Sequence, residues 1–161
     1  MLTKTENNRK DARKVVVVLP YVGETVLMQL RDIKSEIDFP GLWGFFGGSV
    51  ELGEKPEDTA RRELLEELNY KPASLTQLST EYLPEAGNIL SHCFCCSLTV
   101  SVSNLSIKEG RDWGLFSLEE IESNKLYSKK LQKLFPIVPT GHVQRCVKKL
   151  LSHIRMTPQV S

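Results

Sequence analysis

Three glutamates in the middle of the chain have the residue type and the spacing to do chemistry. Glu63, Glu66 and Glu67 stand at i, i+3 and i+4, so an α-helix places all three carboxylates on one side. Like charges held so close repel one another unless water or a cation screens them. Hard oxygen ligands suit Mg²⁺ or Mn²⁺, which stay partly hydrated and bridge carboxylates to phosphate oxygens. The cluster therefore predicts either a solvated helix face or a divalent-cation site that suits a diphosphate substrate.

The segment that must carry these glutamates has both helix ends marked. Apolar residues recur every four positions at Ala60, Leu64 and Leu68, which is the narrow stripe of an amphipathic helix. Pro56 suits the first helical position, where its missing N–H is no loss. Asn69 can take the left-handed conformation that ends a helix. The pattern predicts a helix that begins at Pro56 and ends at Asn69.

A pair of glycines, Gly47 and Gly48, lies before that helix. Glycine lets the backbone approach a ligand or a metal ion closely, so a carbonyl here can be a further hard ligand. Taken alone, the pair is more typical of a β-bulge. The joint spacing is more specific: it runs Gly48, five residues, Glu54, seven residues, and then Arg62-Glu63-Leu64-Leu65-Glu66-Glu67-Leu68-Asn69-Tyr70.

This string resembles the Nudix box, G-x5-E-x7-R-E-U-x-E-E-x-G-U with U a bulky aliphatic residue, at every polar position. Asn69 replaces the last glycine of the box and Tyr70 its last aliphatic residue. Asparagine is the next best residue for a left-handed helix end, so we expect the fold and the site to survive. The resemblance implies an α/β (α+β) Nudix-like fold, with a mixed β-sheet sandwiched between helices. It also implies Mg²⁺-dependent hydrolysis of a nucleoside diphosphate linked to another group, with Mn²⁺ as an alternative ion.

The resemblance further implies a role for each polar residue of the box. The metal-binding positions are Gly47, through its carbonyl, with Glu63, Glu66 and Glu67. Arg62 matches the arginine that orients the glutamates, and Glu54 is its expected partner. Physically, a guanidinium fork fixes a carboxylate in one rotamer and offsets part of the clustered negative charge. Loss of Arg62 should therefore damage a metal site without removing a ligand.

The general base and the substrate contacts are less specific. The base is either Glu63 or Glu109, because Lys108-Glu109-Gly110-Arg111 resembles a downstream loop of MutT-like members. Arg31, at the end of a predicted strand, is a candidate phosphate contact, with a surface salt bridge as the alternative. Trp43 and Phe45 either stack on a nucleobase or pack around the box.

The substrate class stays open at this stage. A nucleoside triphosphate leads, and a nucleotide sugar comes next. Two other functions are weighed against hydrolysis: a catalytically silent Nudix module that senses a nucleotide, and an RNA-binding or decapping protein. The second would use the basic residues near the C-terminus, Arg145, Lys148, Lys149 and Arg155.

The remaining pattern predicts one Nudix domain over residues 1–161. Residues 1–13 form a polar lead-in, and residues 141–155 form a basic amphipathic helix. The order of strands and helices favours a mixed α and β domain. Strands are expected over 14–20, 25–31, 43–51, 73–83, 89–103 and 113–116, and a helix capped by Ser117 over 118–123.

Composition narrows the function classes. Lys plus Arg number 21 against 20 Asp plus Glu, a net charge of +1, so no global field gathers nucleic acid or membrane lipid. No apolar run is long enough to span a bilayer.

The cysteines, Cys93, Cys95, Cys96 and Cys146, are too few for a disulfide scaffold, so we expect core thiols in a cytoplasmic protein. His142 and His153 are expected at the surface. The expected partner is a small nucleotide, and the resemblance also allows a homodimer.

Overall fold

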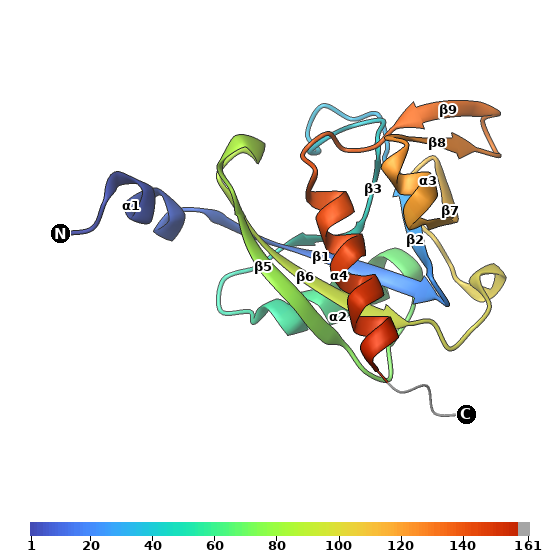
Figure 1. Cartoon of the computed structure of the whole chain (residues 1–161), viewed down its shortest axis with the longest axis horizontal. Helices are drawn as coiled ribbons and strands as arrows, with labels where there is room; N and C mark the ends of the chain where they lie inside the picture. Colours follow the sequence, from blue (N-terminus) through green and yellow to red (C-terminus); the bar gives the residue numbers. More distant parts are fainter. Residues whose placement is uncertain (158–161) are drawn as a thin grey trace.

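The chain folds around one mixed β-sheet that lies between two helices (Figure 1). The computed structural model describes residues 1–157. Helix α2 (Pro56–Leu68) covers one face of the sheet, and helix α4 (His142–Met156) covers the other. The strands of the sheet are β1 (Arg13–Val22), β2 (Thr25–Leu30), β3 (Trp43–Gly44), β4 (Phe46–Ser49), β5 (Thr76–Leu83), β6 (Ile89–Ser97) and β7 (Asp112–Ser117). This arrangement confirms the predicted sandwich.

Strand β1 lies at the centre of the sheet because it presents apolar side chains to both faces of the sheet. Val16 and Val18 belong to the buried cluster that contains Leu64 of α2. Leu19 points the other way, into the cluster that contains Val147 of α4. A strand buried on both faces reads as a continuous apolar run rather than as an alternating one. The apolar run of β1 therefore lies in the middle of the core.

The pairing of β1 sets the position of the glycine pair. Strand β1 runs parallel to β6 and antiparallel to both β2 and β4. Its end pairs with β2, where Tyr21 lies opposite Val26, and its first half pairs with β4, where Val17 lies opposite Gly47. Strand β2 continues the sheet to β3 and β7, and β6 continues it to β5. The glycines are thus held in the sheet directly before α2 begins.

Both ends of α2 form as the sequence predicts. Pro56 occupies the start of the helix, and Asn69 ends it in the left-handed conformation with φ 52°. The N–H of Asn69 donates to the carbonyl of Leu65 across 3.0 Å, which satisfies one of the free carbonyls at the helix end. Ser117 caps the short helix α3 (Leu118–Glu122) in a capping box with Glu120, also as expected.

Several expected boundaries differ from the structure, most of them by one to three residues. The single strand expected over 43–51 is interrupted at Phe45, which separates β3 from β4. The strand expected over 89–103 ends at Ser97 and is followed by the short 3-10 helix η2 (Val102–Asn104). A second 3-10 helix, η1 (Pro84–Ala86), lies between β5 and β6. A hairpin of β8 (Lys125–Ser128) and β9 (Lys133–Pro136) was not predicted, because strands of four residues with several lysines carry almost no alternating signal.

The expected polar lead-in, residues 1–13, contains a helix. Helix α1 (Lys4–Lys10) begins with a capping box between Thr3 and Glu6 and buries no residue. Figure 1 shows it away from the sheet. It therefore adds nothing to the core that positions the site.

All four cysteines are buried free thiols, as the sequence predicts. Among residues 1–157, no helix is both long enough and apolar enough to cross a membrane.

The left-handed residue at the end of α2 generates a stability prediction. Asn69→Ala should lower the free energy of unfolding by about 1 kcal/mol, because alanine lacks the local hydrogen bonding that lets asparagine tolerate φ 52°. Asn69→Gly should match or exceed the wild-type value. Urea unfolding measures both, with exposed Lys71→Ala as the control. Equal stability of Asn69→Ala and the wild-type protein would contradict this account of the helix end.

Candidate functional site

The turn between β4 and α2 brings the glycine pair against the glutamates. The N–H of Gly47 donates to Oε2 of Glu67 across 3.0 Å. A side chain at Gly47 would collide with the carbonyl oxygen of Val16, and one at Gly48 would collide with Oε1 of Glu63. Both positions therefore need glycine because atoms of neighbouring residues occupy the space of a Cβ. The observed contact of Gly47 runs through its N–H, so the metal-ligand role of its carbonyl stays a prediction.

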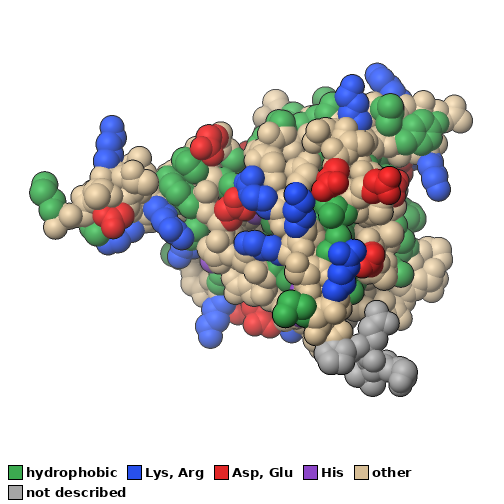
Figure 2. Space-filling model, in the orientation of Figure 1, with side chains coloured by type: hydrophobic (Ala, Val, Ile, Leu, Met, Phe, Trp, Pro, Cys, Tyr) green, Lys and Arg blue, Asp and Glu red, His purple; other side chains and the backbone are tan. Residues whose placement is uncertain are grey.

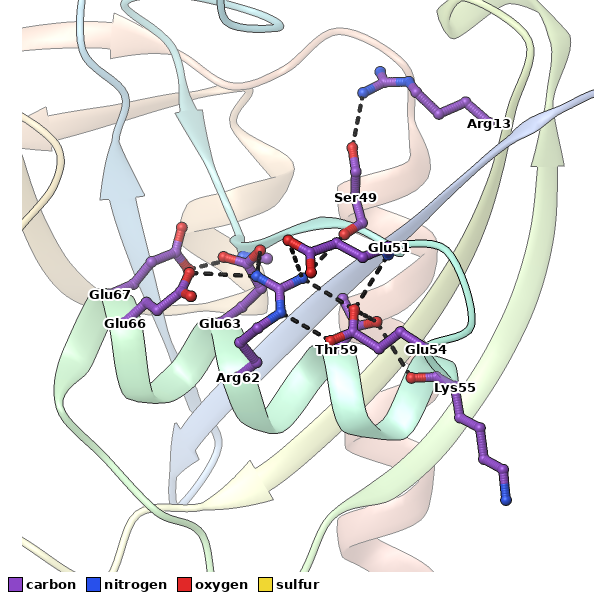
Figure 3. A network of polar contacts seen from close by, with 11 residues as sticks. Arg13, Ser49, Glu51, Glu54, Lys55, Thr59, Arg62, Glu63, Glu66 and Glu67 are labelled. Atoms are coloured by element: carbon purple, nitrogen blue, oxygen red, sulfur yellow. Dashed lines mark hydrogen bonds and ion pairs between the residues drawn. The ribbon is translucent and has the colours of Figure 1, made fainter.

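The guanidinium of Arg62 lies among the carboxylates and holds several of them at once (Figure 3). Its Nε and Nη2 donate to the two oxygens of Glu54, across 2.9 and 3.0 Å. Its Nη1 donates to Glu63 across 2.9 Å and to Glu66 across 3.3 Å. Arg62 thus contacts its predicted partner and orients two of the three predicted ligands.

Glu54 is held as an anion from two sides. The Arg62 fork and the hydroxyl of Thr59, which donates across 2.6 Å, lower the pKa of Glu54 to about 2. A charge-assisted bidentate pair restricts both side chains to one geometry. Glu54 therefore fixes Arg62, and Arg62 fixes the glutamates.

Glu67 is the most buried of the three glutamates, with 5% of its surface exposed. Its burial and the adjacent negative charge of Glu63 raise the pKa of Glu67 to about 8, although the Gly47 N–H and the charge of Arg31 act against the shift. Burial also raises the pKa of Glu63. A buried carboxylate is favourable as an anion only when positive charge or hydrogen bonds compensate it. The site therefore has more negative charge than its own residues offset.

Two predicted residues reach the glutamates from distant parts of the sequence. The loop after η2 crosses the end of α2, where the N–H of Lys108 donates to the carbonyl of Glu67 across 3.1 Å. Glu109 follows, and its negative charge helps to raise the pKa of both Glu63 and Glu67. Arg31, at the end of β2, acts in the opposite direction on Glu67. The fold thus brings a further carboxylate, that of Glu109, and a cation, that of Arg31, close to the Nudix box.

The donor set fits a divalent cation. It consists of carboxylate oxygens, one of them deeply buried and short of compensating charge, which is the ligand type that Mg²⁺ and Mn²⁺ prefer. Over the part of the chain that the structure describes, no three His, Cys, Asp or Glu side chains form a complete cation site. Arg62 instead contacts Glu63 and Glu66 directly. These contacts use Oε1 of Glu63 and Oε2 of Glu66, so the other oxygen of each carboxylate accepts no hydrogen bond from Arg62 and is available to a cation.

The two aromatic candidates lie in the core. Trp43 is fully buried, its indole N–H donates to the carbonyl of Leu126 across 3.0 Å, and its ring packs edge-on against Phe116 at 4.9 Å. The prediction that Trp43 stacks on a base is therefore wrong, because both its faces and its donor are used inside the protein. Phe45 is 7% exposed and belongs to the same core cluster, although it also lines a cavity.

That cavity has a volume of about 310 Å³ and begins at the glycine pair. Gly47, Gly48 and Arg31 line it at the box, and Ser91 and His142 line it near the start of α4. Its volume lies at the small end of the range for ligand pockets. Its other charged lining residues are Arg13, Glu36 and Asp38. The cavity therefore extends from the glycine pair, beside the glutamates, to a wall in which Ser91 and His142 lie among apolar residues such as Leu83, Ile89 and Val143.

His142 lines the cavity, and the sequence interpretation misplaced it. It was expected at the surface, but it is 6% exposed, and its ring contacts Glu81 at 2.8 Å and Ser91 at 2.9 Å. The spacing of His142 and Cys146 on the apolar face of α4 was the available signal. Its two polar partners lie in β5 and β6, so no local pattern could identify them.

Comparison with known proteins decides the family. The model of the Nudix domain matches residues 11–136, which is most of the chain. The chain belongs to the Nudix family. The matched segment contains the whole Nudix box, in which the glutamates, Arg62 and Gly48 described above stand.

Relatives and solved structures agree with that membership. The nucleoside triphosphatase NudI of Escherichia fergusonii is 40% identical over 62 residues, which are 37% of this chain and 43% of that protein. The chain thus aligns with less than half the length of this relative. The fold is similar to the MutT Nudix hydrolase of Burkholderia pseudomallei, with 16% identity, a TM-score of 0.64, and 86% and 98% of the two chains covered. It is also similar to the Nudix domain of Shewanella oneidensis NrtR in complex with ADP ribose, with 20% identity, a TM-score of 0.63, and 95% and 99% covered.

The raised pKa of Glu67 generates a prediction about stability and pH. The folded protein binds this proton more tightly than the unfolded chain, whose carboxyl titrates near pH 4.5. In a chelator, the stabilisation is therefore complete below about pH 4.5 and is lost as the pH rises towards 8. Urea unfolding at a series of pH values measures the decline. Glu67→Gln should flatten it, and an equal decline in that variant would exclude Glu67 as its source.

The close approach at Gly48 generates a second prediction. Gly48→Ala should displace the Glu63 carboxylate and reduce the rise in melting temperature that Mg²⁺ causes in the wild-type protein by at least half. The control is Gly53→Asn, because a Cβ at Gly53 meets no atom within 4 Å and asparagine tolerates its φ of 80°. An unchanged Mg²⁺ effect in Gly48→Ala would show that the position of Glu63 is irrelevant to the ion.

Proposed function

We propose that this protein is a Mg²⁺-dependent nucleoside triphosphate pyrophosphohydrolase that releases a nucleoside monophosphate and pyrophosphate. Mn²⁺ is the alternative ion, and a nucleotide sugar is the second substrate class. One observation carries the proposal: the carboxylates of Glu63 and Glu67 adjoin the glycine pair, and that pair lines a cavity large enough for a nucleoside. The partial match to a nucleoside triphosphatase supports the same substrate class.

The residues assigned to the ion are Glu63, Glu66 and Glu67, with the carbonyl of Gly47. A bound divalent cation would neutralise phosphate oxygens and lower the pKa of a coordinated water. The chain contributes the orientation of its carboxylates, through the contacts of Arg62 with Glu54 and Glu63. It also contributes a buried negative charge at Glu67 that favours cation uptake.

Two carboxylates are candidates for the general base. Glu63 contacts Arg62, which holds one of its oxygens, and its partial burial raises its pKa towards the range useful for accepting a proton. Glu109 belongs to an exposed loop next to the same cluster. We assign the base to this pair, because Glu63 belongs to the carboxylate cluster and the charge of Glu109 acts on two of its members.

The cavity orients the substrate. Arg31 is a cation from outside the box whose charge acts on Glu67, and its Nε donates to a backbone carbonyl, that of Asp38, across 2.8 Å. Within residues 1–157 it forms no salt bridge, so its charge is available to a phosphate. The phosphates would then lie at the glycine pair, and the nucleoside would extend towards Ser91 and His142.

The RNA-binding alternative loses its main support. Figure 2 shows basic and acidic side chains intermingled on the face that carries α4. Arg145 pairs with Glu81 across 2.7 Å, and Arg155 pairs with Glu24 across 2.7 Å. Lys148 lies 3.9 Å from Glu122. A surface whose cations are paired releases few counterions from a nucleic acid.

We therefore favour a small nucleotide as the partner. We place the protein in the reducing cytoplasm, which suits its four buried thiols. The homodimer stays a prediction.

A substrate panel tests the proposal. Purified protein with Mg²⁺ is given ribo- and deoxyribonucleoside triphosphates, nucleotide sugars and ADP-ribose, and the products are separated by anion exchange. We expect a monophosphate and pyrophosphate from a triphosphate. Glu66→Gln and Glu67→Gln should each lower turnover by about two orders of magnitude or more while the fold is retained.

The matched control is Glu57→Gln, which changes an exposed carboxylate at the start of the same helix. It should keep wild-type turnover. Saturable nucleotide binding without product would instead favour the sensing module, and wild-type turnover in the double variant of Glu66 and Glu67 would remove the metal-site assignment.

A further inference from the structure

We propose that Ser91, oriented by His142 and Glu81, reads the nucleobase in the cavity and selects bases that present a carbonyl oxygen when His142 is charged. The proposal rests on the nucleotide binding of the proposed function. It adds a recognition site outside the Nudix box and names a substrate class, the nucleotides of carbonyl-bearing bases such as uracil and hypoxanthine.

The three side chains form a hydrogen-bonded chain that crosses two strands and a helix. Glu81 of β5 and Ser91 of β6 are paired residues in the sheet register, so their side chains share the face that α4 covers. His142 begins α4, and its Nδ1 lies 2.8 Å from Oε2 of Glu81 while its Nε2 lies 2.9 Å from Oγ of Ser91. Both ring nitrogens are therefore engaged.

The end of this chain lies at the cavity. Ser91 and His142 both line it, although they are only 1% and 6% exposed. Apart from His142, the hydroxyl of Ser91 has no hydrogen-bond partner among the described residues. Because a hydroxyl has one donor and two acceptor sites, Ser91 keeps hydrogen-bonding capacity for a ligand in the cavity.

The protonation of His142 decides what that capacity is. Glu81 can only accept, so Nδ1 carries a proton in both states. When the ring is charged, Nε2–H donates to Ser91 Oγ, and the serine O–H is free to donate to a carbonyl oxygen. When the ring is neutral, the serine O–H donates to Nε2, and Oγ is left to accept from an amino group. The two states therefore favour opposite base edges.

The groups around His142 favour its charged state. Glu81 faces it from β5 and is also bound by Arg145 of α4 across 2.7 Å. Cys146 of α4 lies 3.6 Å from both ring nitrogens, so its sulfur faces the ring rather than lying along one N–H, and Cys93 of β6 is buried in the same cluster. Burial acts to lower the pKa of His142, but the contacts with Cys146 and Glu81 outweigh it, so the pKa is raised. The other charged groups of the cavity are Arg13, Arg31, Glu36 and Asp38.

Binding of the monophosphates tests the inference without hydrolysis. Calorimetry from pH 5.5 to 8.5 compares UMP with CMP and IMP with AMP, because the members of each pair exchange a carbonyl for an amino group. The phosphate titrates alike in both members and cancels in the affinity ratio. At low pH the carbonyl member of at least one pair should bind about tenfold more tightly, since a mismatched buried donor or acceptor is left unpaired. The ratio should fall as His142 loses its proton.

Three variants separate recognition from structure. Ser91→Ala should bring the ratio near one at every pH. Glu81→Gln keeps an acceptor for Nδ1 but removes the charge, so it should move the midpoint of the change to lower pH. Ser79→Ala is the control, because Ser79 is a partly buried serine of β5 whose buried Oγ does not line the cavity. It should retain the wild-type ratio and midpoint.

A pH-independent ratio in the wild-type protein would overturn the inference, as would a wild-type ratio in Ser91→Ala or no binding of any monophosphate. If Ser91→Ala fails to fold, the midpoint in Glu81→Gln decides. Hydrolysis of triphosphates with a constant ratio would defeat only this inference. A pH-dependent ratio without hydrolysis of any triphosphate would defeat only the proposed activity.

Discussion

The site depends on one interaction, the contact of a single guanidinium with a crowd of carboxylates. Arg62 donates to Glu54, Glu63 and Glu66 and to the carbonyl of Ser49, so it ties the helix to the strand and loop before it. Without that charge, the carboxylates of one helix face would repel one another at short range. With it, they are oriented but not neutralised, and Glu67 stays buried with little compensation. The residual negative charge is what a divalent cation would complete.

The sheet determines where this charge meets a ligand. Because β1 pairs with both β2 and β4 along its length, the glycine pair is held in the sheet rather than in a free loop. A side chain at Gly47 would displace the neighbouring strand β1, and one at Gly48 would displace Glu63. The same strands form one wall of the cavity, which runs from the glycines to the start of α4. The glycine pair beside the charged residues at one end, and a largely apolar wall with the polar side chains of Ser91 and His142 at the other, form an arrangement that a nucleotide, with its phosphates and its base, would complement.

Residues that interact within a short stretch of sequence could be predicted, and those that interact across the fold could not. The helix from Pro56 to Asn69 and its carboxylate face follow from spacing alone, and both ends form as expected. The surroundings of Trp43 depend on Leu126 and Phe116, which are far along the chain. The sequence therefore allowed two interpretations of an aromatic residue next to the box. His142 was misplaced for the same reason, since its partners Glu81 and Ser91 lie in a different part of the sheet.

The sequence by itself determined the family, the class of fold and the set of acidic groups, because these depend on residue types at fixed spacing along one helix. Tertiary structure alone decided which charges remain uncompensated, since burial of Glu67 and the approach of Arg31 and Glu109 result from packing between distant segments. It also decided that a buried imidazole, rather than an exposed aromatic, lies at the far wall of the cavity. Desolvation and hydrogen bonding across strands have no signature in local spacing, because both depend on which segments the fold brings together.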